Sequence, residues 1–241
     1  MLKLSIVIPV RNEAASVLPV IEKVRAVDCG LEKELIVVDD GSTDDTRRLL
    51  LSLGPAEDLV LVLNDEGLGK GAAMRAGFER ASGDLLIVQD GDLELDPAEI
   101  PALLEPILAG RAQATFGSRF LSGRGQTPLV MYLGNWLLTR AVNILFSTRL
   151  TDLNCCYKLM PTQTARSLGL TADGFDIEAE LTCRLLQQGR TIVEVPVSYR
   201  PRTQDEGKKL RIGAGWTVLR TVVRLRFSRP PLGGQVQDTA S

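Results

Sequence analysis

The carboxylates that follow the fourth apolar run of the chain are the residues best suited to chemistry. The run itself, Leu85–Val88, is short and uninterrupted, which is typical of a strand buried on both faces. Asp90, Asp92 and Glu94 follow it at alternate positions, so up to three carboxylates lie within reach of one point. Hard divalent cations such as Mg²⁺ are held by such groups together with substrate phosphates. We therefore expect a metal-bound diphosphate here, with a solvated acidic turn as the alternative.

The composition narrows the chemistry that is open to the chain. Its 241 residues are 44% hydrophobic, which is enough for one substantial core. There is no histidine, which excludes His-based triads and His metal sites and leaves carboxylates as the expected ligands. The four cysteines have neither Cys-x-x-Cys nor metal spacing, so we expect reduced cytosolic thiols. We expect no secretory signal and no clean membrane span, since the apolar stretch 129–146 is interrupted by Asn135, Arg140 and Asn143.

Charge is distributed unevenly along the sequence. Residues 1–118 contain 11 Lys/Arg and 21 Asp/Glu, whereas residues 119–241 contain 17 Lys/Arg and 9 Asp/Glu. The acidic half could hold a metal, and the basic half could hold phosphates or an anionic membrane surface. Charge scattered over two solvated faces is the alternative.

The order of strand-like and helix-like segments indicates the fold class. Each of the first four apolar runs leads into a stretch with helical spacing, and Asn12 is predicted to cap the first helix. This order predicts an α/β fold with a doubly wound, mostly parallel sheet and helices on both faces. The expected strands are 4–8, 35–38, 59–63, 85–88, 112–116, 159–161 and 191–195, and the expected later helices are 129–146, 175–188 and 216–227.

Polar residues stand at the ends of four successive predicted strands. In open α/β sheets, ligands bind at the carboxyl ends of the strands. These residues should therefore converge on one rim, whereas simple strand capping is the alternative. They are Asn12 with Glu13, Asp39 with Asp40, Asn64, and Asp90 with Asp92.

The glycine-rich turn 67–71 resembles two nucleotide-binding signatures but fits neither. A P-loop would have glycine at Asn64 and Ser or Thr at Gly71. A dinucleotide fingerprint would follow the first strand and would have glycine at Ala72. We expect instead a turn that lets a helix N-terminus approach a diphosphate.

Taken together, these motifs resemble glycosyltransferase family 2, which has the fold called GT-A. The resemblance covers most of residues 3–228, and its first-half motifs are 5–13, 36–44, 67–71 and 89–92. The nearest branch is that of dolichol-phosphate mannose synthase, which makes polyprenyl-phosphate sugars, on the segments 117–120, 151–158, 174–178 and 202–209. Two positions depart from the family pattern, because Gly91 replaces an alanine and Cys155 replaces a threonine.

The resemblance implies roles for the site residues. The nucleotide-sugar-binding set is Pro9, Arg11, Glu13, Asp39, Asp40, Gly69, Lys70 and Asp90, with Glu13 on the ribose and Asp40 on the base. The metal, Mg²⁺ or Mn²⁺, is expected between Asp90, Asp92 and Glu94. Acceptor phosphates are expected at Arg119, Arg140, Arg202 and Lys209, and the catalytic set is Asp90, Asp92 and Arg119.

The implied reaction is an inverting transfer of a hexose, mannose or glucose, from GDP-mannose or UDP-glucose to a dolichyl or undecaprenyl phosphate. A phosphate monoester has a second pKa of about 6 and is largely dianionic at pH 7, so it needs no catalytic base. A family member acting on a hydroxyl acceptor would need one, and Asp152 or Glu178 could serve. A non-catalytic relative is the third possibility.

The expected domain organisation is a single GT-A domain over residues 1–228, followed by a disordered tail over 229–241. Within it, residues 1–118 would bind the nucleotide sugar and residues 119–228 the acceptor. The helix 216–227 has an apolar face, and it has Arg220 and Arg224 on another, which favours a peripheral position on the cytosolic face of a membrane. Packing on the core is the alternative. We expect no nucleic-acid partner, and the oligomeric state stays open.

Overall fold

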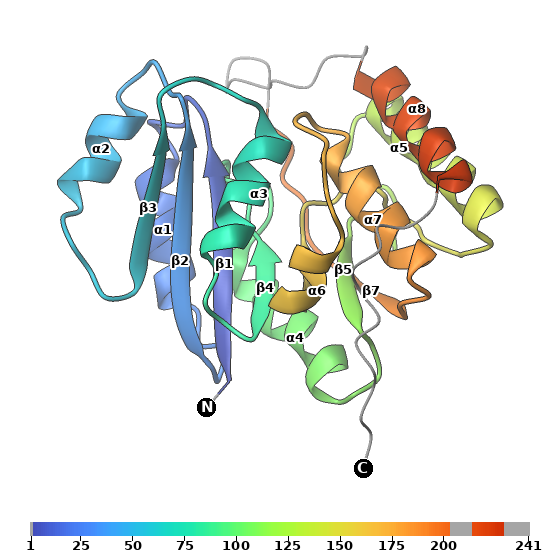
Figure 1. Ribbon diagram of the computed structural model, residues 1–241, viewed down its shortest axis with the longest axis horizontal. Helices are drawn as coiled ribbons and strands as arrows, with labels where there is room; N and C mark the ends of the chain where they lie inside the picture. Colours follow the sequence, from blue (N-terminus) through green and yellow to red (C-terminus); the bar gives the residue numbers. More distant parts are fainter. Residues whose placement is uncertain (1, 203–213, 229–241) are drawn as a thin grey trace.

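A single seven-stranded sheet organises the molecule (Figure 1). The structure, a computed structural model, describes residues 2–202 and 214–228. The strand order is β3-β2-β1-β4-β6-β5-β7. Neighbouring strands are parallel except at β6, which is antiparallel to both β4 and β5. The strands are β1 (Lys3–Val10), β2 (Glu32–Asp40), β3 (Leu59–Asn64), β4 (Leu85–Val88), β5 (Ala114–Ser118), β6 (Lys158–Pro161) and β7 (Ile192–Pro196).

Both faces of the sheet are covered by helices, which explains why its strands are continuously apolar. In β1, Ile6 and Ile8 pack on one face and Val7 on the other, as the twofold alternation of a strand requires. One face is covered by α1 (Val17–Ala26), α2 (Thr46–Ser52) and α4 (Ile100–Leu108), which follows the short 3-10 helix η1 (Pro97–Glu99). The other face is covered by α3 (Lys70–Arg80), α6 (Thr162–Ser167) and α7 (Ile177–Gln187). The predicted α/β fold, with helices on both faces of a mostly parallel sheet, is therefore confirmed.

A third cluster of buried side chains lies beside the sheet, where α7 packs against α5 (Leu129–Phe146) and α8 (Ala214–Phe227) (Figure 1). Strands β1 to β5 come from residues 1–118, and β6 and β7 come from later residues, so the two predicted halves share one sheet. All four cysteines are free, as the sequence predicts.

The first helix begins later than the sequence suggests. It starts at Val17 with Ser16 at the N-cap position, so the predicted cap at Asn12 is wrong. Asn12 has a positive φ of 53°, and its side-chain oxygen accepts a hydrogen bond from Thr43 N at 2.8 Å. The amide side chain therefore joins two loops of the rim instead of capping its own helix.

Helix α5 is the one helix within residues 2–202 and 214–228 that is long and apolar enough, by length and composition, to cross a membrane. Asn135, Arg140 and Asn143 thus do not lower the hydropathy of α5 enough to exclude a span by this measure, contrary to the expectation. Of α5, 22% is buried. The predicted tail 229–241 and the phosphate ligand Lys209 lie outside the described residues and stay predictions.

Candidate active site

The register of the sheet brings the predicted strand ends together. Val10 at the end of β1 pairs with Asp39 of β2, and Asp40 pairs with Asn64 of β3. Strand β4 lies on the other side of β1, so the acidic loop that follows it opens onto the same edge. The loops that carry the predicted nucleotide and metal ligands are therefore neighbours, whereas Pro9 lies within β1 itself.

Asp40 shapes the glycine-rich turn. Its two carboxylate oxygens accept hydrogen bonds from Leu68 N at 2.8 Å and Gly69 N at 2.9 Å. Arg11 Nη1 lies 3.8 Å from the same carboxylate. A Cβ on Gly67 would lie 2.2 Å from the Arg11 guanidinium carbon, so the turn and this arginine are in close contact. Asp40 thus holds the turn against Arg11, and its contact with a nucleobase stays a prediction.

Asp39 is fully buried and is engaged by its own neighbours. Arg47 Nε donates to one carboxylate oxygen at 2.7 Å, and Ser42 N donates to the other at 3.1 Å. Asp39 therefore orders the loop after β2. A direct contact with the nucleotide stays a prediction for this residue.

The N-terminus of α3 is already capped by backbone. Gly71 N donates to Asp173 O at 2.7 Å, and Ala72 N donates to the same oxygen at 3.3 Å. Gly69 has a φ of 110°, and a Cβ on it would lie 2.3 Å from that carbonyl. Asp173 O thus accepts two of the first donors of α3, and the approach of this helix end to a diphosphate stays a prediction.

Lys70 and Asp90 meet in a row of alternating charges. Lys70 Nζ lies 2.8 Å from Asp90 Oδ1 and 3.0 Å from Glu178 Oε1, and buried Lys158 lies 2.9 Å from Glu178 Oε2. Burial lowers the pKa of Lys70, but the carboxylates of Asp90 and Glu178 outweigh it and raise that pKa well above its usual value. Burial likewise raises the pKa of Asp90, and Lys70 outweighs it, so the net shift is downward. Lys70 and Asp90 both stay charged at neutral pH.

The surroundings of Asp92 disfavour its negative charge. Burial, and then the charges of Asp90 and Glu94, raise the pKa of Asp92 to about 7. Its Oδ1 accepts a hydrogen bond from Glu94 N at 3.1 Å. A cation beside Asp90 and Asp92 would relieve this repulsion, so the two carboxylates fit a hard divalent metal.

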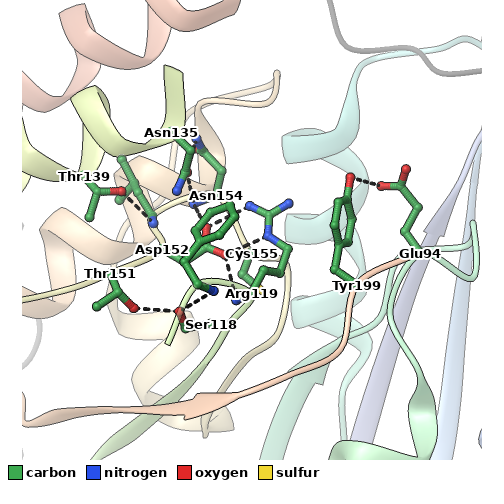
Figure 2. A network of polar contacts seen from close by, with 12 residues as sticks. Glu94, Ser118, Arg119, Asn135, Thr139, Thr151, Asp152, Asn154, Cys155 and Tyr199 are labelled. Carbon is green, nitrogen blue, oxygen red and sulfur yellow. Dashed lines mark hydrogen bonds and ion pairs between the residues drawn. The ribbon is translucent and has the colours of Figure 1, made fainter. Parts of the chain in front are cut away.

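Glu94 does not complete the expected metal site. Its carboxylate accepts a hydrogen bond from Arg202 N at 2.7 Å. It also accepts one from the Tyr199 hydroxyl at 3.1 Å (Figure 2). Leu93 has a φ of 60°, which turns the chain between Asp92 and Glu94. In the described part of the chain, no three acidic or cysteine side chains are grouped closely enough to hold a metal. Asp90 and Asp92 stay the predicted ligands, whereas the carboxylate of Glu94 is engaged by Arg202 and Tyr199.

Arg202 connects three parts of the rim. Its guanidinium lies 2.8 Å from Glu13 Oε2 and donates to Ser16 Oγ and to the carbonyl of Asp92, both at 3.0 Å. These contacts thus hold Arg202 against the acidic loop. The arginine lies beside the candidate metal site, and its contact with an acceptor phosphate stays a prediction.

One edge of the Arg119 guanidinium is hydrogen-bonded to a carboxylate (Figure 2). Aromatic rings lie near its flat faces. Its Nε and Nη2 donate to the two oxygens of fully buried Asp152 at 2.7 and 2.8 Å. The rings of Tyr199 and Phe120 lie 5.0 and 5.3 Å from its guanidinium carbon, within cation–π range. Burial lowers the pKa of Arg119, but Asp152 outweighs it and raises that pKa further, so the group is a fixed cation.

The loop that carries Asp152 is itself supported from β7. Glu194 accepts hydrogen bonds from Thr151 N at 2.8 Å and from Asp152 N at 3.0 Å. Burial raises the pKa of Glu194 in spite of these bonds. Ser118 Oγ lies 2.6 Å from the Thr151 hydroxyl and ties β5 to the same loop. Asp152 is therefore placed by the sheet.

Some predicted residues lie apart from this group, and some important ones escape the sequence reasoning. Arg140 is exposed on α5 and forms no ion pair with any residue that the structure describes. Tyr199 and Lys158 were not predicted, and Asp152 was considered only as a base. Lys158 ends the motif 151–158 of the family resemblance, but the sequence assigns no role to this lysine.

Comparison with known proteins agrees with this geometry. The sequence profile of glycosyl transferase family 2 matches residues 5–164. The low-salt glycan biosynthesis hexosyltransferase Agl6 of Haloferax volcanii is 30% identical over 240 residues, which are 95% of this chain and 56% of Agl6. The undecaprenyl-phosphate mannosyltransferase of Micrococcus luteus is 30% identical over 212 residues, which are 84% of this chain and 85% of that protein.

A solved structure shares the fold. Glucosyl-3-phosphoglycerate synthase of Mycobacterium tuberculosis, in complex with Mg²⁺ and uridine diphosphate, has a TM-score of 0.71 and 26% identity, with 93% of this chain and 79% of that chain covered. The chain spans 56%, 65% and 39% of the lengths of three Haloferax volcanii glycosyltransferases that it matches. From the profile match over residues 5–164 and these similarities, the chain belongs to glycosyl transferase family 2.

Proposed function

We propose that this chain is an inverting glycosyltransferase that moves a hexose from a nucleotide sugar to the phosphate of a polyprenyl phosphate. The observation that carries the proposal is the state of the two candidate bases. Asp152 is paired with Arg119, and Glu178 is paired with Lys70 and Lys158. A hydroxyl acceptor would need a free base to take its proton. A phosphate acceptor brings its own negatively charged oxygen, because its second pKa is about 6.

Arg119 is the residue best placed to hold that phosphate. Its Nε and Nη2 are committed to Asp152, and the aromatic rings fix the plane of the guanidinium. The phosphate oxygen would attack the anomeric carbon from the side opposite the leaving group. The new carbon–oxygen bond forms as the bond to the nucleoside diphosphate breaks, and the electron pair leaves with the diphosphate. This geometry inverts the anomeric centre.

Asp90 and Asp92 would hold the divalent cation, Mg²⁺ or Mn²⁺, whose charge would neutralise the leaving diphosphate. Lys70 lies 2.8 Å from Asp90 and adds a second positive charge at the same place. Crystals of the Mycobacterium tuberculosis synthase contain Mg²⁺ with uridine diphosphate, or Mn²⁺ with UDP-glucose, which supports the use of a divalent metal by this chain. The name of the Micrococcus luteus relative supports the polyprenyl phosphate acceptor. GDP-mannose and UDP-glucose are both retained as donors.

The proposed location is peripheral, on the cytosolic face of a membrane. Large apolar side chains are exposed along α5, at Leu129, Val130, Leu133, Trp136, Leu137 and Ile144. On α8, Trp216 and Phe227 are 75% and 81% exposed. Arg220 and Arg224 of α8 are exposed as well, and cations next to apolar residues are typical of helices that lie in an anionic interface. The lipid acceptor could then reach Arg119 from the bilayer surface.

Two measurements test the proposal. In the first, the protein is incubated with labelled GDP-mannose or UDP-glucose, undecaprenyl phosphate, and Mg²⁺ or Mn²⁺, and the lipid product is extracted. We expect hexose transfer from one of the two donors, and we expect chelation of the metal to abolish it. No lipid product with either donor would contradict the proposal.

In the second measurement, the protein is floated with vesicles that contain anionic lipid. Flotation should weaken as salt rises and when Arg220 and Arg224 are both replaced by glutamine. Equal flotation of parent and variant would contradict the membrane contact of α8.

A further inference from the structure

One face of α5 carries a polar stripe that is hydrogen-bonded to the loop 150–154. Asn135, Thr139 and Asn143 recur every four residues, so they lie on the same side of the helix. Asn143 Nδ2 donates to Leu150 O at 2.8 Å, and its Oδ1 accepts from Leu150 N at 2.9 Å. Thr139 Oγ1 accepts a hydrogen bond from Leu153 N at 3.1 Å. The stripe therefore positions the loop that carries Asp152.

Asn135 is the member of the stripe whose side-chain oxygen has hydrogen-bond partners and whose side-chain nitrogen has none among the described residues. Its Oδ1 accepts hydrogen bonds from Asn154 Nδ2 at 2.8 Å and from Asn154 N at 3.2 Å. Both are donors, so the oxygen must face Asn154, and the amide orientation is fixed by the network. The Nδ2 of Asn135 is buried and has no hydrogen-bond partner among residues 2–202 and 214–228. The residue is 6% exposed, and a buried donor of this kind calls for an oxygen that the protein does not supply.

The unpartnered amide belongs to the same network as Arg119 (Figure 2). Asn154 N, which lies against Asn135, also lies 3.2 Å from Asp152 Oδ1. That oxygen accepts the hydrogen bond from Arg119 Nη2 at 2.8 Å. Asn135 and Arg119 are thus linked through one backbone amide and one carboxylate.

We propose that Asn135 is a further acceptor-binding residue, whose Nδ2 donates a hydrogen bond to an oxygen of the phosphate held by Arg119. The inference rests on the proposed function, since it takes the acceptor group to be a phosphate. A neutral amide suits the position because it adds a donor without competing with Arg119 for the carboxylate of Asp152. It also connects acceptor binding to α5, the helix whose other face exposes apolar side chains.

The test uses Asn135→Asp, because aspartate keeps an oxygen for both donors of Asn154, removes the N–H groups and adds a negative charge that a phosphate would not tolerate. Losing a hydrogen bond to a charged group should raise the KM for undecaprenyl phosphate by about 10- to 100-fold. The KM for the nucleotide sugar should stay within about twofold, because none of the predicted nucleotide-sugar ligands lies on α5. Asn135→Ala, which adds no charge, should raise the acceptor KM in the same direction and guards against a misfolded aspartate variant.

Gln187→Glu is the matched control. It makes the same amide-to-carboxylate change away from the loop 150–154, and its amide nitrogen donates to Ser228 O at 3.1 Å. We expect it to lower the melting temperature and to leave the KM for undecaprenyl phosphate unchanged. An acceptor KM that stays at the parent value in both Asn135 variants would overturn the assignment, while a parent protein with no transfer to undecaprenyl phosphate would overturn the proposed function instead.

Discussion

Replacing Asp152 with asparagine tests whether a buried carboxylate holds Arg119. Asparagine has nearly the same shape, but it removes the negative charge and turns an NH₂ group toward the guanidinium donors. Removing one partner of a buried ion pair costs about 3–5 kcal/mol, because the other charge stays buried. Arg119 is 13% exposed at its side chain and could keep one hydrogen bond to the amide oxygen, so we expect the lower end, about 3 kcal/mol. For a chain of this size, that corresponds to a fall in Tm of roughly 6–12 °C.

Thermal unfolding followed by circular dichroism measures this effect. The matched control is Glu105→Gln, which removes an ion pair between Glu105 and Arg111. Both of these side chains are more than half exposed. Such surface pairs contribute about 0.2–1 kcal/mol, so the control should shift Tm far less. If Asp152→Asn and Glu105→Gln lowered Tm by the same small amount, the buried pair would not be what fixes Arg119. The acceptor site would then need another explanation.

Three further predictions concern the metal, the acid stability and the glycine-rich turn. Asp92→Ala should abolish divalent-dependent transfer without lowering Tm, since its carboxylate is crowded by like charges; full activity would remove Asp92 from the metal site. Burial raises the pKa of Glu34, but hydrogen bonds from Lys3 and Ser5 help to lower it to about 2. The fold should therefore lose about 3 kcal/mol as pH falls from about 4.5 to 2, and denaturant titrations of Glu34→Gln should show a flatter profile. Gly69→Ala should lower the free energy of unfolding by about 1–3 kcal/mol and should weaken nucleotide binding. Gly54 also has a positive φ but faces open space, so Gly54→Ala should affect stability alone. Equal nucleotide affinity in the two variants would contradict a role of the glycine-rich turn in nucleotide binding.

The core elements could be predicted from the sequence because burial dictates their pattern. Strand β4 is buried on both faces and reads as an uninterrupted apolar run, and α5 was expected at 129–146, where it is found. The convergence of Asp40 and Asn64 followed from topology alone, since parallel strands end at one edge.

The errors arise where tertiary contacts override local patterns. Glu94 is close to Asp92 in sequence, but the turn at Leu93 directs it to Tyr199, more than a hundred residues later. The cap on α3 is the carbonyl of Asp173, a backbone contact that no residue type signals. Asn135 and Asn143 of the α5 stripe were noted in the sequence, but they were interpreted only as polar interruptions of an apolar segment.

The central claim is that the acceptor supplies its own charged oxygen and the protein supplies no base. The most direct measurement compares hexose transfer to undecaprenyl phosphate and to undecaprenol, the alcohol with the same chain, under identical donor and metal concentrations. The expected result is a sugar phosphodiester of inverted anomeric configuration from the phosphate and no product from the alcohol. Transfer to the alcohol at a comparable rate would contradict the account, because it would require a base that Asp152 and Glu178, in their ion pairs, do not provide.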